Sequence, residues 1–397
     1  SALALAPTIP PTIVKVAAST DNLVENDANG VADVFVFDRT NRTIALVSVN
    51  QAGTRSGNAA STSAALSSDG RTVVFQSQAS DLVAGDTNAA SDVFIRELES
   101  GVTRLVSITP DGAVGNGASI NPRITPDGRW VVFESTATNL VAEAVSRGSQ
   151  VYVRDRLRET TLGIAGLAQD YKSTDAASLS GDGSWVAYRG VTRPGIRPLF
   201  PPSLHVRETS GTPPRSVVTA PEELTFSSVY EVTAPALSFN GRWVGYLLRT
   251  GATNEVSDMI WTNEVALYDA SSGQTVVIQR SPHALPQGTG LDRLTPAVSS
   301  DGRFLTYCLP QLVPGTTNVV VQLFFWDALL QGPAPRMITA AADGSGPANG
   351  DSVDPQMSSD GRQVVFVSTA TDLVAGVDTP GRRLYRWDRE TGKIEVI

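Results

Sequence analysis

The chain has 397 residues, a formal net charge of −9 and a pI near 4.9, and 41% of its residues are hydrophobic while 18% are charged. This composition supports a buried core and excludes a disordered polyelectrolyte. The acidic balance without a run of Lys or Arg argues against a nucleic acid partner, and no apolar stretch reaches the roughly 18 residues of a membrane span. Length alone suggests two or three domains.

A turn signature recurs along the chain in a constant register. Its Asp or Asn stands at positions 69, 127, 182, 240, 301 and 360, which gives a period of about 58 residues. The six copies are SSDGR (67–71), TPDGR (125–129), SGDGS (180–184), SFNGR (238–242), SSDGR (299–303) and SSDGR (358–362).

A second marker, an apolar strand closed by an acid, follows each turn by about 27 residues and occurs once more before the first turn. Its seven copies predict seven units: DVFVFD (33–38), DVFIRE (92–97), QVYVRD (150–155), SLHVRE (203–208), EVALYD (264–269), QLFFWD (322–327) and RLYRWD (383–388). We expect each closing acid to cap the hairpin turn that follows it by accepting backbone N–H bonds.

Each unit reads as four short strands. In the third unit they are 121–125, 129–135, 150–155 and 160–166, and Gly128 supplies the positive φ of the first hairpin. No segment shows helical periodicity over three turns. The sequence therefore predicts an all-β fold, a seven-bladed β-propeller of four-stranded antiparallel blades. This single domain spans 1–397, with blades at approximately 1–50, 51–108, 109–166, 167–220, 221–281, 282–340 and 341–397.

The repeat resembles the TolB-like, WD-repeat-like bacterial β-propeller repeats. The likeness is clearest in SSDGRTVVFQSQASDLV (67–83) and SSDGRQVVFVSTATDLV (358–374), and it extends over essentially the whole chain. It implies the propeller fold. Such propellers act as docking platforms, periplasmic assembly factors and accessory domains of peptidases, so the resemblance implies no single function.

Two early segments suggest a cation site. Asp27, Asn29 and Asp33 are spaced like Asp86, Asn88 and Asp92 in the next unit. Alternating oxygen side chains in a short loop suit calcium, although the central Gly and terminal Glu of an EF-hand loop are missing. Asn and Asp also favour turns through their own backbone bonds. Calcium is therefore an alternative to having no cofactor.

The inventory of reactive side chains argues against catalysis. The only two histidines are His205, inside a strand, and His283, in a loop, and no GxSxG elbow accompanies them. The single Cys308 lies in a strand-like run and is expected to be a buried structural thiol. Trp130 and its equivalents just after the turns, Trp185 and Trp243, are expected to pack between sheets.

Charged residues in or just before the first strands mark the expected mouth of the channel. They are Arg123, Asp175, Asp292, Arg293 and Asp354. Few charges in strands of small neutral residues give little support to a catalytic funnel.

A proline-rich loop at 193–202 is the one segment expected to expose apolar groups to a protein partner. Those groups are Ile196, Leu199 and Phe200.

The sequence thus favours a non-catalytic, exported propeller, periplasmic or extracellular, that acts as an interaction scaffold or accessory subunit with a protein partner. A first residue of Ser followed by ALALAP is compatible with a removed leader. One alternative is a hydrolase or lyase that uses the mouth of the channel. Another is a carbohydrate- or calcium-binding module.

Overall fold

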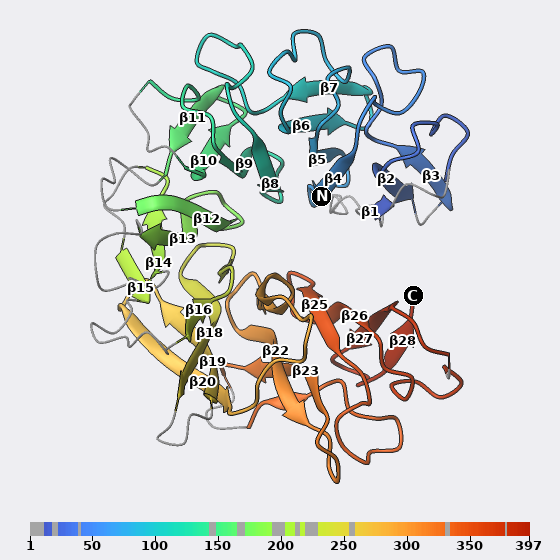
Figure 1. Cartoon of the computed structure of the whole chain (residues 1–397), viewed down its shortest axis with the longest axis vertical. Coiled ribbons are helices and arrows are strands. Elements are labelled where there is room, and N and C mark those ends of the chain that lie inside the picture. Colours follow the sequence, from blue (N-terminus) through green and yellow to red (C-terminus); the bar gives the residue numbers. More distant parts are fainter. Residues whose placement is uncertain are drawn as a thin grey trace, which may run out of the picture. The chain divides into compact units, whose positions relative to one another are not determined.

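The computed structural model describes residues 12–17, 23–38, 41–142, 148–164, 171–192, 203–210, 215–218, 229–253, 259–329, 334–377 and 379–397. The regular secondary structure of these residues is almost entirely β-strand, joined by turns and loops (Figure 1). The 3-10 turn η1 (Leu291–Leu294) is the one helical element among them, and they contain no helix with the length and hydropathy of a transmembrane segment. The chain divides into two compact units, Ser1–Gly183 and Ser184–Ile397, which are described separately.

The described part of the first unit contains three antiparallel sheets and a final strand. Each sheet pairs strands that are consecutive in the sequence. The sheets are β1 (Thr12–Ala17), β2 (Asp33–Asp38) and β3 (Thr43–Leu46); β4 (Ser61–Leu66), β5 (Thr72–Ser77), β6 (Asp92–Glu97) and β7 (Val102–Leu105); and β8 (Ser119–Ile124), β9 (Trp130–Ser135), β10 (Gln150–Asp155) and β11 (Thr160–Gly163). The final strand is β12 (Tyr171–Leu179).

The second unit repeats this arrangement. Its first sheet pairs β13 (Trp185–Thr192), β14 (Ser203–Glu208) and β15 (Arg215–Val218). The next has β16 (Val229–Val232) and β17 (Ala236–Leu237) on one side of β18 (Trp243–Thr253), followed by β19 (Met259–Asp269) and β20 (Gln274–Ser281). The last two are β21 (Ala297–Val298), β22 (Phe304–Leu312), β23 (Val319–Asp327) and β24 (Arg336–Met337); and β25 (Ser352–Met357), β26 (Gln363–Ser368), β27 (Arg383–Asp388) and β28 (Ile394–Val396).

The all-β prediction and the four-stranded antiparallel sheets are confirmed. The predicted third strands coincide with β2, β6, β10, β14 and β27. Some predicted bounds differ from the structure. The fourth strand of the third unit, predicted over 160–166, is β11 and ends at Gly163, and residues 165–166 lie outside the described residues. The third strands predicted to begin at 264 and 322 begin earlier, at Met259 and Val319, and β18, which pairs with β19, has 11 residues. The extension of β18 and β19 is rich in Thr, Ile and Trp, which favour extended backbone.

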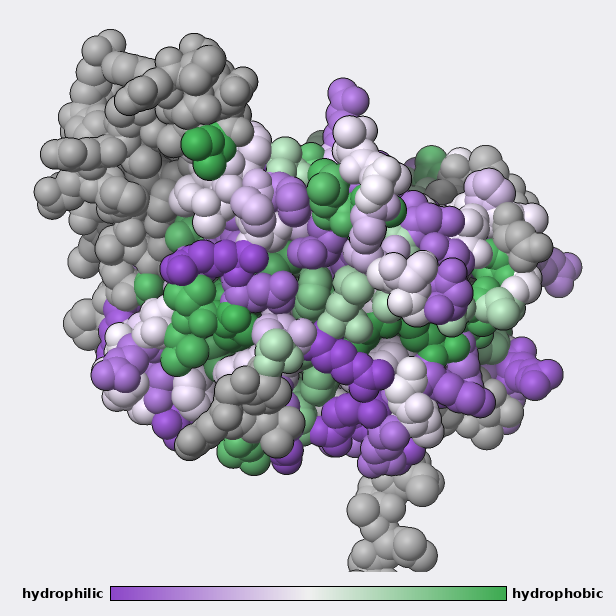
Figure 2. All heavy atoms as spheres, turned by 90° about the horizontal axis from the view of Figure 1, so that it is seen from below, coloured by the Kyte–Doolittle hydropathy of each residue, from purple (hydrophilic) through white to green (hydrophobic). Residues whose placement is uncertain are grey.

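Apolar second and third strands form the core of each sheet. In β5, Val73, Val74 and Phe75 are fully buried, as expected for a strand covered on both faces. The second and third strands also stack aromatic rings, with centroid distances of 5.6–5.8 Å in the following pairs. They are Phe75–Phe94, Phe133–Tyr152, Tyr307–Phe324 and Phe366–Tyr385. On the face drawn in Figure 2, hydrophilic and hydrophobic side chains are interspersed, as on an ordinary protein surface.

The glycine of a turn is the contact point for an aromatic ring of the preceding sheet. A Cβ at Gly302 would overlap the ring of Trp243, and one at Gly183 would overlap Trp130. Gly302 also has a φ of +75°, which already disfavours other residues. The same contact joins Trp185 to Gly241 and Phe304 to Gly361. The predicted packing of these tryptophans between sheets is confirmed.

The five aspartates among the acids that close the third strands cap the following turns, as predicted. Glu97 differs from the prediction, because it accepts the hydroxyl of Thr72 and pairs with Arg156. Asp155 Oδ1 accepts the N–H of Leu157 at 3.0 Å, and Asp388 Oδ1 accepts that of Glu390 at 3.0 Å. The sequence reasoning missed that the same carboxylates bind the arginine of the Asp/Asn-Gly-Arg turn. The pairs, with their N–O distances, are Arg129–Asp155 (2.7 Å), Arg242–Asp269 (2.9 Å), Arg303–Asp327 (2.8 Å) and Arg362–Asp388 (3.1 Å). The Arg129 bond is the main reason why the pKa of Asp155 is lowered.

Candidate functional site

Charged residues of the second unit meet beside a small cavity. Arg293 lies in η1, and Asp354 lies in β25, 61 residues later. Nε and Nη2 of Arg293 both donate to Oδ2 of Asp354, at 3.0 and 2.7 Å. Because both bonds end on one oxygen, no hydrogen bond among the described residues occupies Asp354 Oδ1 or Arg293 Nη1. The pair therefore keeps one acceptor atom, Asp354 Oδ1, and one donor atom, Arg293 Nη1, outside the mutual ion pair.

A β-bulge aims Asp354 at this position. The register of β25 against β26 shifts between Val353 and Gln356, and Asp354 has a φ of +57°. Asp tolerates this left-handed backbone better than most residues because its side chain can bond locally. The same bulge occurs in β4 at Ser63 and in β8 at Asn121, with φ values of +49° and +54°. The bulge is thus part of the repeat, whereas the residue that stands in it differs from one sheet to the next.

The adjoining cavity has a volume of about 100 Å³ and a polar wall. Thr289, Arg293, Asp351, Thr369 and Arg382 supply its polar side chains. Asp351 is held in place because its Oδ1 accepts the N–H of Val321 at 2.8 Å. A cavity of this size accommodates a single small group, such as one peptide unit or one carboxylate.

Cys308 lies beneath this cluster and is fully buried in β22. Burial raises the pKa of its thiol well above the usual value, and the charge of Asp354 raises it further. The thiol therefore stays protonated, as predicted for a structural cysteine.

The other residues predicted to mark the mouth of the channel do not belong to this cluster. Asp292 is exposed and does not line the cavity. Arg123 lies in β8 and Asp175 in β12, both in the first unit, so the cluster described above rests on the second unit alone. In the first unit, Arg123 Nη1 donates to the carbonyl of Pro122 at 3.1 Å.

The sequence reasoning missed two polar residues in the second strands. Gln76 accepts the N–H of Asn121 at 2.8 Å, and Glu134 accepts that of Ala176 at 2.9 Å. Both acceptors stand at the fifth position of the second strand, directly after three apolar residues. A polar residue at this position in both repeats could have indicated their shared role. They tie the bulge of one sheet to the preceding sheet.

The two Asp-x-Asn-x-x-x-Asp segments form matching hydrogen-bond networks. Asn88 Nδ2 donates to Asp92 Oδ2 and to the carbonyl of Gly115, both at 2.8 Å, and Ser107 donates to Asp92 Oδ1 at 2.7 Å. Asn29, Asp33, Ser48 and Gly57 repeat these contacts. In both networks the asparagine amide presents its N–H groups, not its oxygen, to the acid.

Both networks bury a carboxylate. Asp33 and Asp92 are 1% and 0% exposed, and burial raises the pKa of each to about 6, partly offset by the serine and asparagine bonds. Asp27 and Asp86 lie nearby and add to the increase. The described residues contain no group of three or more His, Cys, Asp or Glu suited to a metal ion. Calcium binding stays a prediction.

His205 occupies the place of an aromatic residue in the core. Its ring lies 5.6 Å from that of Tyr188, in the position that Phe94 and Tyr152 occupy in their sheets. Burial lowers its pKa to about 4, and its Nε2 lies 2.6 Å from Ser203 Oγ. This neutral, packed histidine matches the sequence expectation. Ile196, Leu199 and Phe200 lie outside the described residues, so the partner surface proposed for them stays a prediction.

Comparison with known proteins identifies the fold. No family model matches the chain, and no curated protein does either. Among solved structures, the β-propeller domain of the Trilobed protease from Pyrococcus furiosus is 12% identical with a TM-score of 0.50, over 97% of this chain and 93% of that one. The chain thus shares the β-propeller fold.

Two further similar structures are longer enzymes. A puromycin hydrolase complexed with PGG is 14% identical with a TM-score of 0.54, over 98% of this chain and 52% of that one. A prolyl endopeptidase is 16% identical with a TM-score of 0.53, over 92% of this chain and 46% of that one. The chain therefore spans about half the length of these enzymes.

These comparisons contradict the expectation of a non-catalytic scaffold that is not an enzyme. Several of the similar structures are peptidases or hydrolases. The inventory of histidines and cysteines concerned only the residues of this chain, which matches about half the length of those enzymes.

Proposed function

We propose that this chain is the substrate-binding propeller of a hydrolase that acts on peptides. Its likeness to propeller-containing peptidases supports the reaction class. The observation that carries the proposal is the Arg293–Asp354 pair beside the polar cavity.

The chemistry of the pair suits the main chain of a peptide. Arg293 Nη1 can donate to a carbonyl and Asp354 Oδ1 can accept an N–H, so the pair supplies one donor and one acceptor to main-chain groups of an extended peptide. The mutual bond between Arg293 and Asp354 fixes both side chains before the substrate arrives, which lowers the ordering cost of binding. The proposed role of these residues is to position the peptide, while the hydrolytic step belongs to groups outside this pair.

Peptide binding by variants that each remove one charge tests the proposal. We expect fluorescence polarisation to detect binding of labelled oligopeptides to the chain, and Asp354→Asn or Arg293→Gln to weaken it about tenfold. Asp292→Asn is the matched control, because Asp292 adjoins Arg293 in sequence but is exposed, and the ion pair of Arg293 is with Asp354 instead. Equal binding by all variants, or no peptide binding at millimolar concentration, would overturn the proposal.

We also propose that the sheets are the seven blades of one propeller and that the protein is exported. The 58-residue period over 397 residues supports the blade number, and the TolB-like character of the repeat supports a periplasmic or extracellular location. An experimental structure of the whole chain tests the first point. Fractionation of the native cells tests the second.

A further inference from the structure

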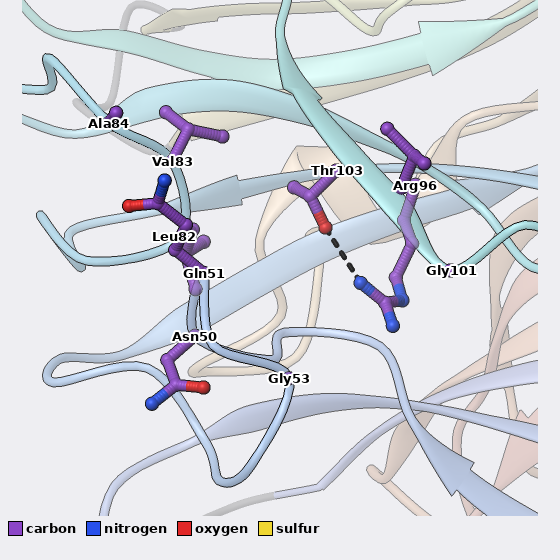
Figure 3. A pocket seen from close by; sticks show the side chains of 10 residues that line it. Asn50, Gln51, Gly53, Leu82, Val83, Ala84, Arg96, Gly101 and Thr103 are labelled. Atoms are coloured by element: carbon purple, nitrogen blue, oxygen red, sulfur yellow. Dashed lines mark hydrogen bonds between the residues drawn. The ribbon is translucent and has the colours of Figure 1, made fainter.

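A larger cavity lies in the first unit, remote in sequence from the Arg293 pair. Its volume is about 320 Å³, within the range of small-molecule sites. One wall is the linker turn at Asn50, Gln51 and Gly53, and the opposite wall comes from β6 and β7 with the turn between them (Figure 3).

Arg96 is the only ionisable side chain that lines this cavity. Its Nη1 donates to Thr103 Oγ1 at 2.8 Å, and Figure 3 shows the guanidinium between Thr103 and the turn at Gly53. No carboxylate of the described residues forms an ion pair with it. Burial lowers its pKa, and no neighbouring acid offsets this effect. Arg96 is thus a half-buried cation without a counter-ion.

Arg154 provides an internal comparison. It occupies the same register in β10, and its Nη1 donates to Thr161 Oγ1 at 3.1 Å, as Arg96 does to Thr103. Burial lowers its pKa as well, but the charges of Glu159 and Asp155 oppose that change. The repeat therefore supplies carboxylates near one arginine and leaves the other without them.

The other walls of the cavity select the kind of anion. The N–H groups of Gln51 and Gly53 already bind the carbonyls of Asp81 and Asn50, so neither of them is available to a phosphate. A single planar guanidinium can hold a carboxylate through two parallel bonds. Leu82, Val83 and Val102 add an apolar side.

We infer that the cavity at Arg96 binds a small organic carboxylate with an apolar side group, of the size of one acylated amino acid. The guanidinium of Arg96 receives the carboxylate, and Val83 and Val102 contact the apolar group. This site is independent of the proposed peptide site at Arg293, because all its residues lie in the first unit.

N-acetyl-L-leucine and N-acetyl-L-leucinamide are suitable probes, because they differ only in the carboxylate. In ligand-observed NMR titrations of the full chain, we expect the acid to bind at least about tenfold more tightly than the amide. Arg96→Gln should remove this preference, and Arg154→Gln should leave it intact. Binding of the acid should also weaken as salt is added.

A second variant separates binding from folding. Ala84→Phe narrows the cavity without changing any charge, and it should weaken acid binding even if Arg96→Gln fails to fold. The inference is overturned if acid and amide bind alike, if neither binds at millimolar concentration, or if Ala84→Phe and a folded Arg96→Gln both bind like the original chain.

Discussion

Two regions of the molecule link neighbouring parts of the repeat by different physical means. In the first unit, Asp92 at the start of β6 is bonded through Asn88 and Ser107 to the linker that leads into the next sheet. In the second unit, the ring of Trp243 packs on the turn glycine of the next sheet, Gly302. The first junction buries a carboxyl group, and the second buries only neutral atoms.

Gln322 shows that the buried charge is not required by the fold. It occupies in β23 the repeat position that Asp92 occupies in β6, accepts the hydroxyl of Thr339 at 2.6 Å, and donates to the carbonyls of Ala348 and Gly350. One amide thus makes the connections that take two residues, Asp92 and Asn88, in the first unit. The stability contributed by this repeat position can therefore depend on pH, with Asp, or not depend on it, with Gln, while the fold of the sheet stays the same.

The largest expected effect is on the aromatic junction. Gly302→Ala should lower the free energy of unfolding by about 3 kcal/mol, because a left-handed backbone costs an L-residue about 1–2 kcal/mol and overlap with Trp243 adds about 1–3 kcal/mol. The matched control is Gly315→Ala, where φ is +74° and no atom lies within 4 Å of the added Cβ, so only the backbone cost of about 1 kcal/mol applies. Urea midpoints followed by circular dichroism measure both, and equal losses would show that the ring contact contributes nothing.

The buried carboxyl groups of Asp33 and Asp92 should make the free energy of unfolding depend on pH. The pKa of Asp33 and of Asp92 is about 6 in the folded chain, above the usual 3.8, so the folded state binds more protons between these values. Stability therefore falls as pH rises through this window, by about 1.4 kcal/mol per unit of pKa difference for each acid. Asp33→Asn with Asp92→Asn should flatten the profile, as measured by melting temperature from pH 4 to 7.

Gln322→Glu tests the comparison between Asp92 and Gln322 in the opposite direction. Gln322→Glu places an acid in the second unit at the equivalent position, where the side chain is fully buried. It should introduce a decrease of stability with rising pH that the original residue does not cause. A flat difference between the two melting profiles would mean that the position tolerates charge, and that the contrast between the units has another cause.

The smallest expected effect concerns the hydroxyl donors of the two regions. Ser107→Ala should cost about 2 kcal/mol above pH 6, because the lost bond ends on a charged carboxylate, and Thr339→Val should cost about 1 kcal/mol, because its bond ends on an amide. Both hydroxyls are fully buried and both also accept a backbone N–H, so the pair is matched. Chemical unfolding at pH 7 and pH 5 measures both losses, and we expect the difference between the two variants to be smaller at pH 5.

The strands and turns were predictable because they depend on local chemistry. Asp-Gly turns and runs such as TVVFQS specify hairpins and buried strands without reference to distant residues. The candidate site was only partly predictable. Asp292, Arg293 and Asp354 were selected together as charges near first strands, yet only Arg293 and Asp354 meet, because a bulge turns Asp354 toward η1. A single extra residue in one strand is not apparent from the hydrophobic pattern of the sequence.

The sequence by itself determined the repeat, its period and the four-stranded antiparallel unit, since these follow from the spacing of turn residues and apolar strands. Only the tertiary structure decided which polar groups meet. It placed Arg96 in a cavity without a carboxylate, gave Arg154 acids beside it, and joined Asn88 to Asp92 by a hydrogen bond. The physical reason is that local propensities set the backbone, whereas the partner of a charged side chain depends on residues that other strands bring beside it.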